Sequence, residues 1–303
     1  MDLKKQFRKK KDGSLLDKRS GLEYALFAVV FIIFAIYAIS LIYPFIWLIL
    51  SSFKESTEYI LDISQGRPFD LPDGLCWYNY QYALSEMNLN GTNFIGMFFN
   101  SVWYSGLSTL LGVFACTCTG YILSRFQFPG RNLIYSIAII TMTVPIVGST
   151  GGTFKLVSNL GIYNSPLYVI FISLGGFGMP FMVFYGFFKN ISWSYAEAVY
   201  IDGGGDATVF FRIMLPQATP VIISLFVVSF ITAWNNYETT LMYLPSYPTI
   251  ASGMYNIKNT LVRTGKDVIY FAGIIISVIP IIALFSALSD TIMNNMTVGG
   301  LKG

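Results

Sequence analysis

Residues 24–53 read YALFAVVFIIFAIYAISLIYPFIWLILSSF, thirty consecutive residues without a charged side chain. A helix needs about 20 apolar residues to cross the hydrocarbon core of a bilayer, which is roughly 30 Å thick. The apolar part of a cleaved signal peptide has only about 7–15 residues, so this run is too long for one. The stretch therefore predicts an uncleaved first membrane span.

Further runs of low charge follow along the chain. Only 12% of the 303 residues are charged and 54% are hydrophobic, whereas about a quarter of the residues in soluble globular proteins are charged. This composition excludes a soluble enzyme and a disordered protein. The runs predict an all-α integral membrane protein with six transmembrane helices, at 24–50, 94–123, 132–154, 166–188, 218–243 and 268–290.

Missing residue types and motifs exclude several kinds of site. The chain has no histidine, which excludes a Ser-His-Asp or Cys-His nucleophile and a histidine-ligated metal. Its cysteines, Cys76, Cys116 and Cys118, form no Cys-x-x-Cys pair, so we expect neither a metal knuckle nor a disulfide framework. No Gly-x-x-x-x-Gly-Lys-Ser/Thr phosphate loop is present, and a net charge of +3 is too small to indicate nucleic acid as a partner.

The basic residues predict the orientation of the chain. Lys and Arg accumulate in the short loops on the cytoplasmic side of membrane proteins. With a cytoplasmic N-terminus and six spans, 13 of the 19 basic residues lie inside and six lie outside. This bias favours two cytoplasmic termini, and the basic segment 1–23 is also suited to contact anionic membrane lipid.

The loop between the expected fourth and fifth spans, residues 189–217, reads KNISWSYAEAVYIDGGGDATVFFRIMLPQ. Ser194 and a glutamate three residues later have the spacing of a capping box, which predicts the start of a short helix. Gly203 and the next two glycines predict its end, because glycine readily adopts positive φ. Asp206 is expected to cap a second helix, which Pro216 ends. This shape indicates a docking element, and an amphipathic hairpin lying on the membrane is the alternative.

The spacing within this loop resembles a motif of bacterial ABC importer permeases. That motif has the order Glu-Ala-Ala, Gly, Ile-x-Leu-Pro, and the departure here is Val199, where the family usually has alanine. The resemblance implies a set of residues that couple the chain to an ATPase, namely Glu197, Ala198, Asp202, Gly203, Ile213, Leu215 and Pro216. Other segments resemble carbohydrate-uptake permeases, and the C-terminal one resembles the maltose-type second permease subunit: residues 43–54, 121–131, 143–145, 234–235 and 299–303.

The resemblance implies a transmembrane permease domain over 24–303 in a bacterial cell membrane, preceded by the basic cytoplasmic segment 1–23. The implied partners are a homologous second permease subunit, two copies of a cytoplasmic ATPase and an extracellular or periplasmic solute-binding protein. The chain itself is implied to be non-catalytic and to bind no cofactor, because ATP and Mg²⁺ belong to the ATPase. The implied function is ATP-driven import of a sugar or oligosaccharide, coupled through the 194–216 loop, whose first helix moves as a lever.

Polar and helix-breaking residues within the spans mark a candidate substrate pathway. Amides bond sugar hydroxyls, an aromatic ring packs on the apolar face of a sugar, and a broken helix lines a cavity. The glycines and proline of the third span predict a break in its outer half, and residues 175–180 predict another in the fourth. The alternatives are hydrogen bonds between helices and close packing of small residues. The candidates are Pro145, Gly151, Trp234, Asn235, Asn236 and Glu238.

An ion-coupled secondary transporter is the main alternative function. It requires internal repeats and a coupling-ion site, whereas the sequence has no convincing repeat and few ionisable residues within its apolar runs. A membrane enzyme would require a Ser-Lys or paired-carboxylate site. Glu55 and Glu58 are close in sequence, but they fall in a charged loop just outside the first span, which favours a solvated surface.

Overall fold

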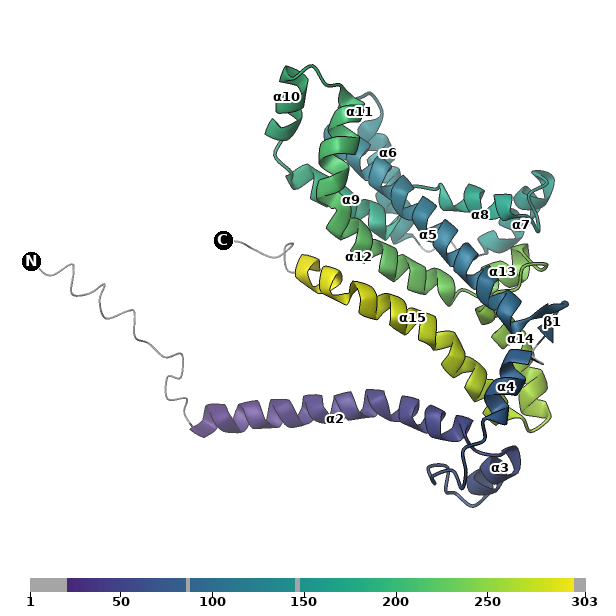
Figure 1. Cartoon of the computed structure of the whole chain (residues 1–303). Helices are drawn as coiled ribbons and strands as arrows, with labels where there is room; N and C mark the ends of the chain where they lie inside the picture. The colour runs from purple at the N-terminus through teal and green to yellow at the C-terminus, as the bar shows by residue number, and fades with distance from the viewer. Residues whose placement is uncertain (1–20, 86–87, 145–147, 297–303) are drawn as a thin grey trace, which may run out of the picture.

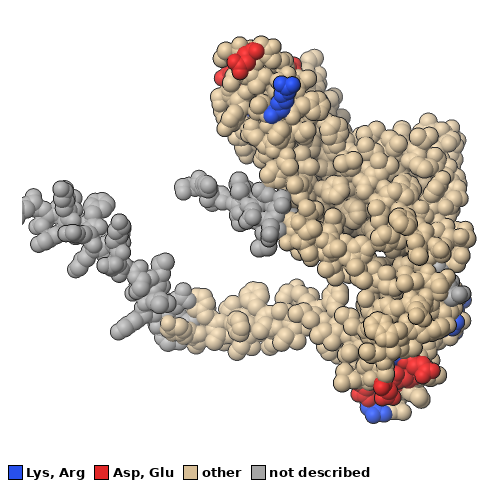
Figure 2. Space-filling view, in the orientation of Figure 1, with Lys and Arg blue, Asp and Glu red and all other residues tan. Residues whose placement is uncertain are grey.

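The computed structural model describes residues 21–85, 88–144 and 148–296, and most of these residues are helical. Within these ranges, four helices are long and apolar enough to cross a membrane: Tyr24–Ser52, Phe94–Arg125, Asp206–Trp234 and Asp267–Ser289. Figure 1 shows α5 (Phe94–Arg125), α12 (Leu215–Trp234) and α15 (Asp267–Met296) packed beside one another. The charged side chains visible in Figure 2 gather at two opposite ends, with an uncharged surface between them.

The first long helix, α2 (Gly21–Ser52), projects away from this bundle, and the C-terminal end of α2 contacts α15 (Figure 1). The contact includes Trp47, whose ring lies 5.4 Å from that of Phe271. Over Tyr24–Ser52 the most apolar window has no buried residue. An apolar helix with no cover from its own chain is suited to lipid or to a partner helix.

The segment after α2 is folded rather than extended. It contains α3 (Ser56–Ser64) and α4 (Tyr78–Ser85), and a buried ion pair of Lys54 with Asp62 attaches α3 to the end of α2. The side-chain amide of Asn79 donates to the carbonyl oxygens of Ser52 at 2.8 Å and Lys54 at 2.9 Å. These bonds satisfy backbone acceptors that the end of α2 leaves free.

A two-residue hairpin leads into α5. Its strands are β1 (Asn88–Leu89) and β2 (Thr92–Asn93), and the turn residues Asn90 and Gly91 have φ of +52° and +81°. Two successive positive φ values are typical of the tight turns that join antiparallel strands. Asn93 then caps α5, because its side-chain oxygen accepts a 2.8 Å hydrogen bond from the amide of Gly96.

The third and fourth predicted spans are each divided into two helices, as the glycines and prolines within them predict. α6 (Arg131–Thr143) and α7 (Ser149–Asn159) are separate, and Gly148 before α7 has φ of +85°. α8 (Pro166–Ser173) and α9 (Met179–Asn190) are separated by residues 174–178, where Gly176 and Gly178 have positive φ. Both predicted helix breaks are therefore confirmed.

The predicted fifth span ends early, and a further helix lies between it and the predicted sixth span. α12 ends at Trp234, and α13 (Glu238–Tyr243) is a separate short helix, so one span over 218–243 is wrong. α14 (Ile250–Arg263) lies in the region 245–267. Its Ile250, Met254 and Leu261 are buried at helical spacing, which orders a segment too polar to be predicted as a span.

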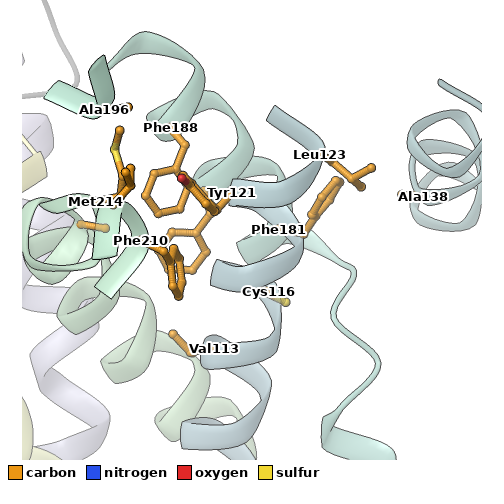
Figure 3. Packing of buried hydrophobic residues seen from close by; sticks show 13 residues of the cluster. Val113, Cys116, Tyr121, Leu123, Ala138, Phe181, Phe188, Ala196, Phe210 and Met214 are labelled. Carbon is orange, nitrogen blue, oxygen red and sulfur yellow. The ribbon is translucent and has the colours of Figure 1, made fainter. Parts of the chain in front are cut away.

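The core at one end of the bundle is aromatic (Figure 3). Tyr121 of α5 lies 5.3 Å from the ring of Phe188 in α9 and 4.9 Å from that of Phe210. The two helices approach closely at Gly120, where an added Cβ would lie 2.7 Å from the Cβ of Phe184. A glycine is therefore required for this crossing. The loop between the expected fourth and fifth spans is attached to this core.

Candidate functional site

The loop of residues 189–217 forms a short helix, a glycine turn and the start of a long helix. The first helix is α10 (Ser194–Ile201) and the second is α11 (Asp206–Thr208), as Figure 1 shows at one end of the bundle. The capping box predicted for Ser194 is wrong, because Trp193 precedes the helix with helical φ and ψ and Ser194 is already in it. The hydroxyl of Ser192 accepts from the amide of Ser194 at 3.3 Å instead.

The glycine turn ends α10 as its sequence predicts. Gly203 has φ of +78°, its amide donates to the carbonyl of Tyr200 at 3.1 Å, and the amide of Gly204 donates to that of Val199 at 2.8 Å. These two bonds form a Schellman motif, which satisfies the last carbonyls of the helix. Gly204 is also required sterically, since a Cβ there would lie 2.5 Å from a methyl carbon of Val199.

Asp206 bridges the two helices and does not cap the second. Gly205 occupies the capping position of α11, and Asp206 is its first residue. The phenol of Tyr200 donates to Oδ1 of Asp206 at 2.6 Å. This hydrogen bond raises the pKa of Tyr200 to about 12, because ionisation of the phenol would remove the donor and place a second negative charge beside Asp206.

Pro216 does not end the second helix. α11 continues through a π-helical turn, η1 (Val209–Met214), into α12 without interruption. Proline has no backbone N–H to donate within a helix. We attribute the tolerance of Pro216 at this position to the π-helical turn before it, which changes the hydrogen-bond pattern of the helix. Ile213 and Leu215 are half-buried and Pro216 is exposed. Ile213, Leu215 and Pro216, which were predicted to lie in a loop, therefore lie in one continuous helix with α12.

Arg125 attaches the loop to the end of α5. One guanidinium nitrogen donates to the carbonyl of Ile191, and the guanidinium carbon lies 5.4 Å from the ring centre of Trp193. The sequence places Arg125 among the cytoplasmic basic residues and in the segment 121–131, and this contact was not predicted. An arginine at the end of an apolar run, with a tryptophan at the start of a short helix, was the available signal.

The opposite side of α10 is exposed. Ala196 is fully buried beneath the helix, whereas Ile201 is 85% exposed and Tyr195 is 52% exposed. Glu197, Ala198 and Asp202 are exposed as well, and Gly203 is exposed in the turn. The helix thus presents apolar and acidic side chains away from the bundle, and Figure 2 shows acidic and basic side chains at this end.

The structure does not bring the predicted pathway residues together. Trp234 is buried, stacks on Phe230 at 5.7 Å and donates to the carbonyl of Ser277 at 3.2 Å. The amide of Asn235 donates to the carbonyl of Ile231 at 2.9 Å, in its own helix. Trp234 therefore packs between helices.

The remaining candidates make other contacts, and Asn236 and Glu238 line two different pockets. Asn236 accepts from the amide of Thr239 at 3.0 Å, and exposed Glu238 begins α13. Gly151 is exposed in α7, and Pro145 lies outside the described residues. Asn235 and Asn236 therefore form hydrogen bonds within residues 231–239, whereas the alternative prediction placed such bonds between helices.

Comparison with known proteins identifies the family. Residues 108–297 match the family model described as binding-protein-dependent transport system inner membrane component. The chain is 28% identical to the diacetylchitobiose uptake system permease protein NgcG of Streptomyces coelicolor, covering 88% of this chain and 86% of that protein. It is 30% identical to the arabinooligosaccharides transport system permease protein AraQ of Halalkalibacterium halodurans, covering 89% and 94%.

A solved structure shares the fold. The structure of a bacterial ABC transporter involved in the import of the acidic polysaccharide alginate matches with a TM-score of 0.75 and 20% identity, over 90% of this chain and 99% of that chain. The predicted resemblance to carbohydrate-uptake ABC permeases is confirmed. The chain belongs to the family of inner membrane components of binding-protein-dependent transport systems.

Proposed function

We propose that this chain is a permease subunit of an ATP-driven importer that carries a sugar or oligosaccharide into the cell. One observation supports the proposal most strongly. α10 presents an exposed face away from the bundle, while its other side is attached to α5 through Arg125 and Trp193. An element attached in this way transmits a push from a partner to the membrane helices.

The partner that pushes is a cytoplasmic ATPase, present in two copies. Exposed Tyr195 and Ile201 supply apolar contacts to it, and Glu197 and Asp202 supply polar ones. ATP binding closes the ATPase pair, and α10 moves with it, so that ATP favours one of two packings of the helices. ATP and Mg²⁺ bind to the ATPase, and this chain contributes neither a phosphate loop nor a catalytic group.

The remaining partners follow from the topology. We assign α6 with α7 and α8 with α9 to two broken spans, which with α2, α5, α12 and α15 makes six and places both termini in the cytoplasm. Membrane lipid and a homologous second permease cover the exposed helix α2. The segments on the opposite side from α10, including α3, α4 and α14, face an extracellular or periplasmic solute-binding protein.

The relatives indicate the substrate class. They are named for diacetylchitobiose, for arabinooligosaccharides and, in Salmonella typhimurium, for maltose and maltodextrin. These are neutral sugars, so neutral oligosaccharides are the first substrates to test.

Purification of the chain in detergent from its native cells tests the proposal. The expected result is recovery of a second permease and an ATPase, with ATP hydrolysis stimulated by a sugar-loaded binding protein. The Ile201→Asp variant should lose the ATPase, whereas Ile60→Asp, an exposed isoleucine of α3, should retain it. Recovery of the wild-type chain without an ATPase would contradict the proposal.

A further inference from the structure

Residues 65–71, which follow α3, fold back along the last turns of α2. The ring of Phe69 lies 5.0 Å from that of Tyr43, and the indole nitrogen of Trp47 donates to the carbonyl of Pro68 at 2.9 Å. Tyr43 and Trp47 both belong to α2 and precede its last residue, Ser52. The 65–71 turn therefore lies beside a membrane helix rather than beyond its end.

The depth of this turn follows from the length of α2. The uncharged run 24–53 is about 45 Å long at 1.5 Å per residue, and a hydrocarbon core of roughly 30 Å centred on it leaves about 7 Å at each end. Trp47 then lies at the edge of the hydrocarbon core, where tryptophan is enriched, and Tyr43 lies about 7 Å inside it. Phe69, which packs on Tyr43, is thus at the depth of the acyl chains.

The side chains of the turn suit this depth. Phe69 is 53% exposed and Leu71 is 73% exposed, so the described residues of the chain leave much of their apolar surface uncovered. Arg67 and Asp70 form an exposed ion pair at 3.5 Å between them. Apolar residues with charged neighbours are typical of the boundary between acyl chains and headgroups, because the charged groups reach the headgroups while the apolar ones enter the acyl region.

The backbone of the turn makes most of its own hydrogen bonds. The amides of Gln65, Gly66 and Arg67 donate to carbonyls of α3 at 2.9, 3.1 and 2.8 Å. The amide of Asp70 donates to the carbonyl of Arg67 at 3.3 Å. Pro68 has no N–H, and its carbonyl accepts the indole hydrogen bond described above. Unsatisfied backbone groups are strongly unfavourable in lipid, so a turn with these bonds already made can enter it.

We propose that the 65–71 turn inserts Phe69 and Leu71 into the membrane leaflet at the C-terminal end of α2, so that lipid covers these two side chains. A second permease is the other candidate to cover them. In Figure 1, α15 and the bundle lie on one side of the end of α2 and α3 lies on the other, away from the bundle. A protein interface would also remove water from the pair of Arg67 and Asp70, whereas headgroups keep it hydrated. The inference goes beyond the proposed function and is independent of the substrate and energy source of transport.

The test uses the complete transporter, purified with its natural partners and placed in lipid nanodiscs. All native cysteines are changed to alanine, and a nitroxide spin label is attached to the Phe69→Cys variant. Paramagnetic resonance then compares collisions with oxygen, which concentrates among acyl chains, and with a water-soluble nickel complex. Leu75→Cys is the matched control, because Leu75 is 61% exposed and the amide of the next residue donates to the carbonyl of Phe53, beyond the end of α2.

We expect oxygen collisions to exceed nickel collisions severalfold at position 69, and the reverse at position 75. Equal nickel access at the two positions would place the turn in water. Low access of both reagents to position 69 would place it beneath another protein subunit. Either of these results would overturn the inference.

A second measurement needs no substitution and decides if the cysteine-free complex fails to assemble. The wild-type complex is irradiated in nanodiscs that contain a phospholipid with a diazirine near the headgroup end of one acyl chain. Mass spectrometry then locates the lipid adducts. Adducts should form on residues 68–71 and not on residues 73–75. Adducts on α2 and α15 without any on residues 68–71 would contradict the inference.

Discussion

Tyr200 and Asp206 are joined by a 2.6 Å hydrogen bond that spans the glycine turn between α10 and α11. Because α11 continues through η1 into α12, this bond fixes the angle between the exposed helix and a long membrane helix. The Schellman motif at Gly203 and Gly204 fixes the same angle through the backbone. Under the proposed coupling, a displacement of α10 is therefore passed to α12 with little loss in the turn.

Removal of the Tyr200 phenol should loosen the turn without unfolding the chain. The hydrogen bond is exposed, so Tyr200→Phe should cost about 1 kcal/mol and speed amide exchange of residues 203–208 roughly fivefold. Hydrogen exchange with mass spectrometry measures this directly. Asp206→Ala should have the same effect, and the double variant should be no worse than either. Additive effects would show that the two side chains act independently.

A side chain at Gly203 should disturb coupling. At φ of +78°, Gly203→Val strains the backbone by about 1–2 kcal/mol, which reduces the native turn roughly 5–30-fold. Stimulation of ATP hydrolysis by the sugar-loaded binding protein should fall, while membrane insertion persists. Gly205→Ala is the matched control, because Gly205 has φ of −104° and no atom within 4 Å of an added Cβ. Normal sugar uptake by Gly203→Val would rule out this role for the turn.

Arg125 should be needed to hold α10 against α5. Arg125→Ala loses a charge-assisted hydrogen bond to Ile191 and the contact with Trp193, together about 2–4 kcal/mol. We expect ATP hydrolysis to persist while sugar uptake per ATP falls at least tenfold. Arg125→Lys should recover it only in part, because lysine is a point donor that stacks poorly. Lys189→Ala, an exposed basic residue nearby, is the control, and an equal loss there would argue against a specific link.

A side chain added at Gly120 should disturb the crossing of α5 and α9. Gly120→Ala places a Cβ 2.7 Å from that of Phe184 and 3.0 Å from the backbone nitrogen of Tyr185, so overpacking should destabilise the chain by about 1–3 kcal/mol. Thermal unfolding in detergent measures the change. Gly106→Ala in the same helix meets no atom within 4 Å and should be neutral or slightly stabilising. A Gly120→Ala variant as stable as Gly106→Ala would contradict the close approach.

The sequence was informative where one physical rule acts alone. Long uncharged runs predict α2, α5, α12 and α15, and the glycine run predicts the end of α10, because length and positive φ are local requirements. Ser194 and Pro216 were misread because neighbouring geometry overrides their usual preferences. Trp193 has helical φ and ψ, and a π-helical turn precedes Pro216.

The candidate site was harder to predict than the fold. Trp234 has the chemistry of a sugar-binding residue, yet tertiary packing buries it against Phe230 and Ser277.

Sugar uptake by proteoliposomes with ATP supplied or withheld, and with ion gradients imposed or abolished, tests the central claim most directly. The vesicles contain the purified complex, and the sugar-loaded binding protein is present on the outer side. Uptake that requires ATP on the ATPase side and persists without any ion gradient is the predicted result. Uptake driven by a proton or sodium gradient in the absence of ATP would contradict the assignment of this chain to an ATP-driven importer.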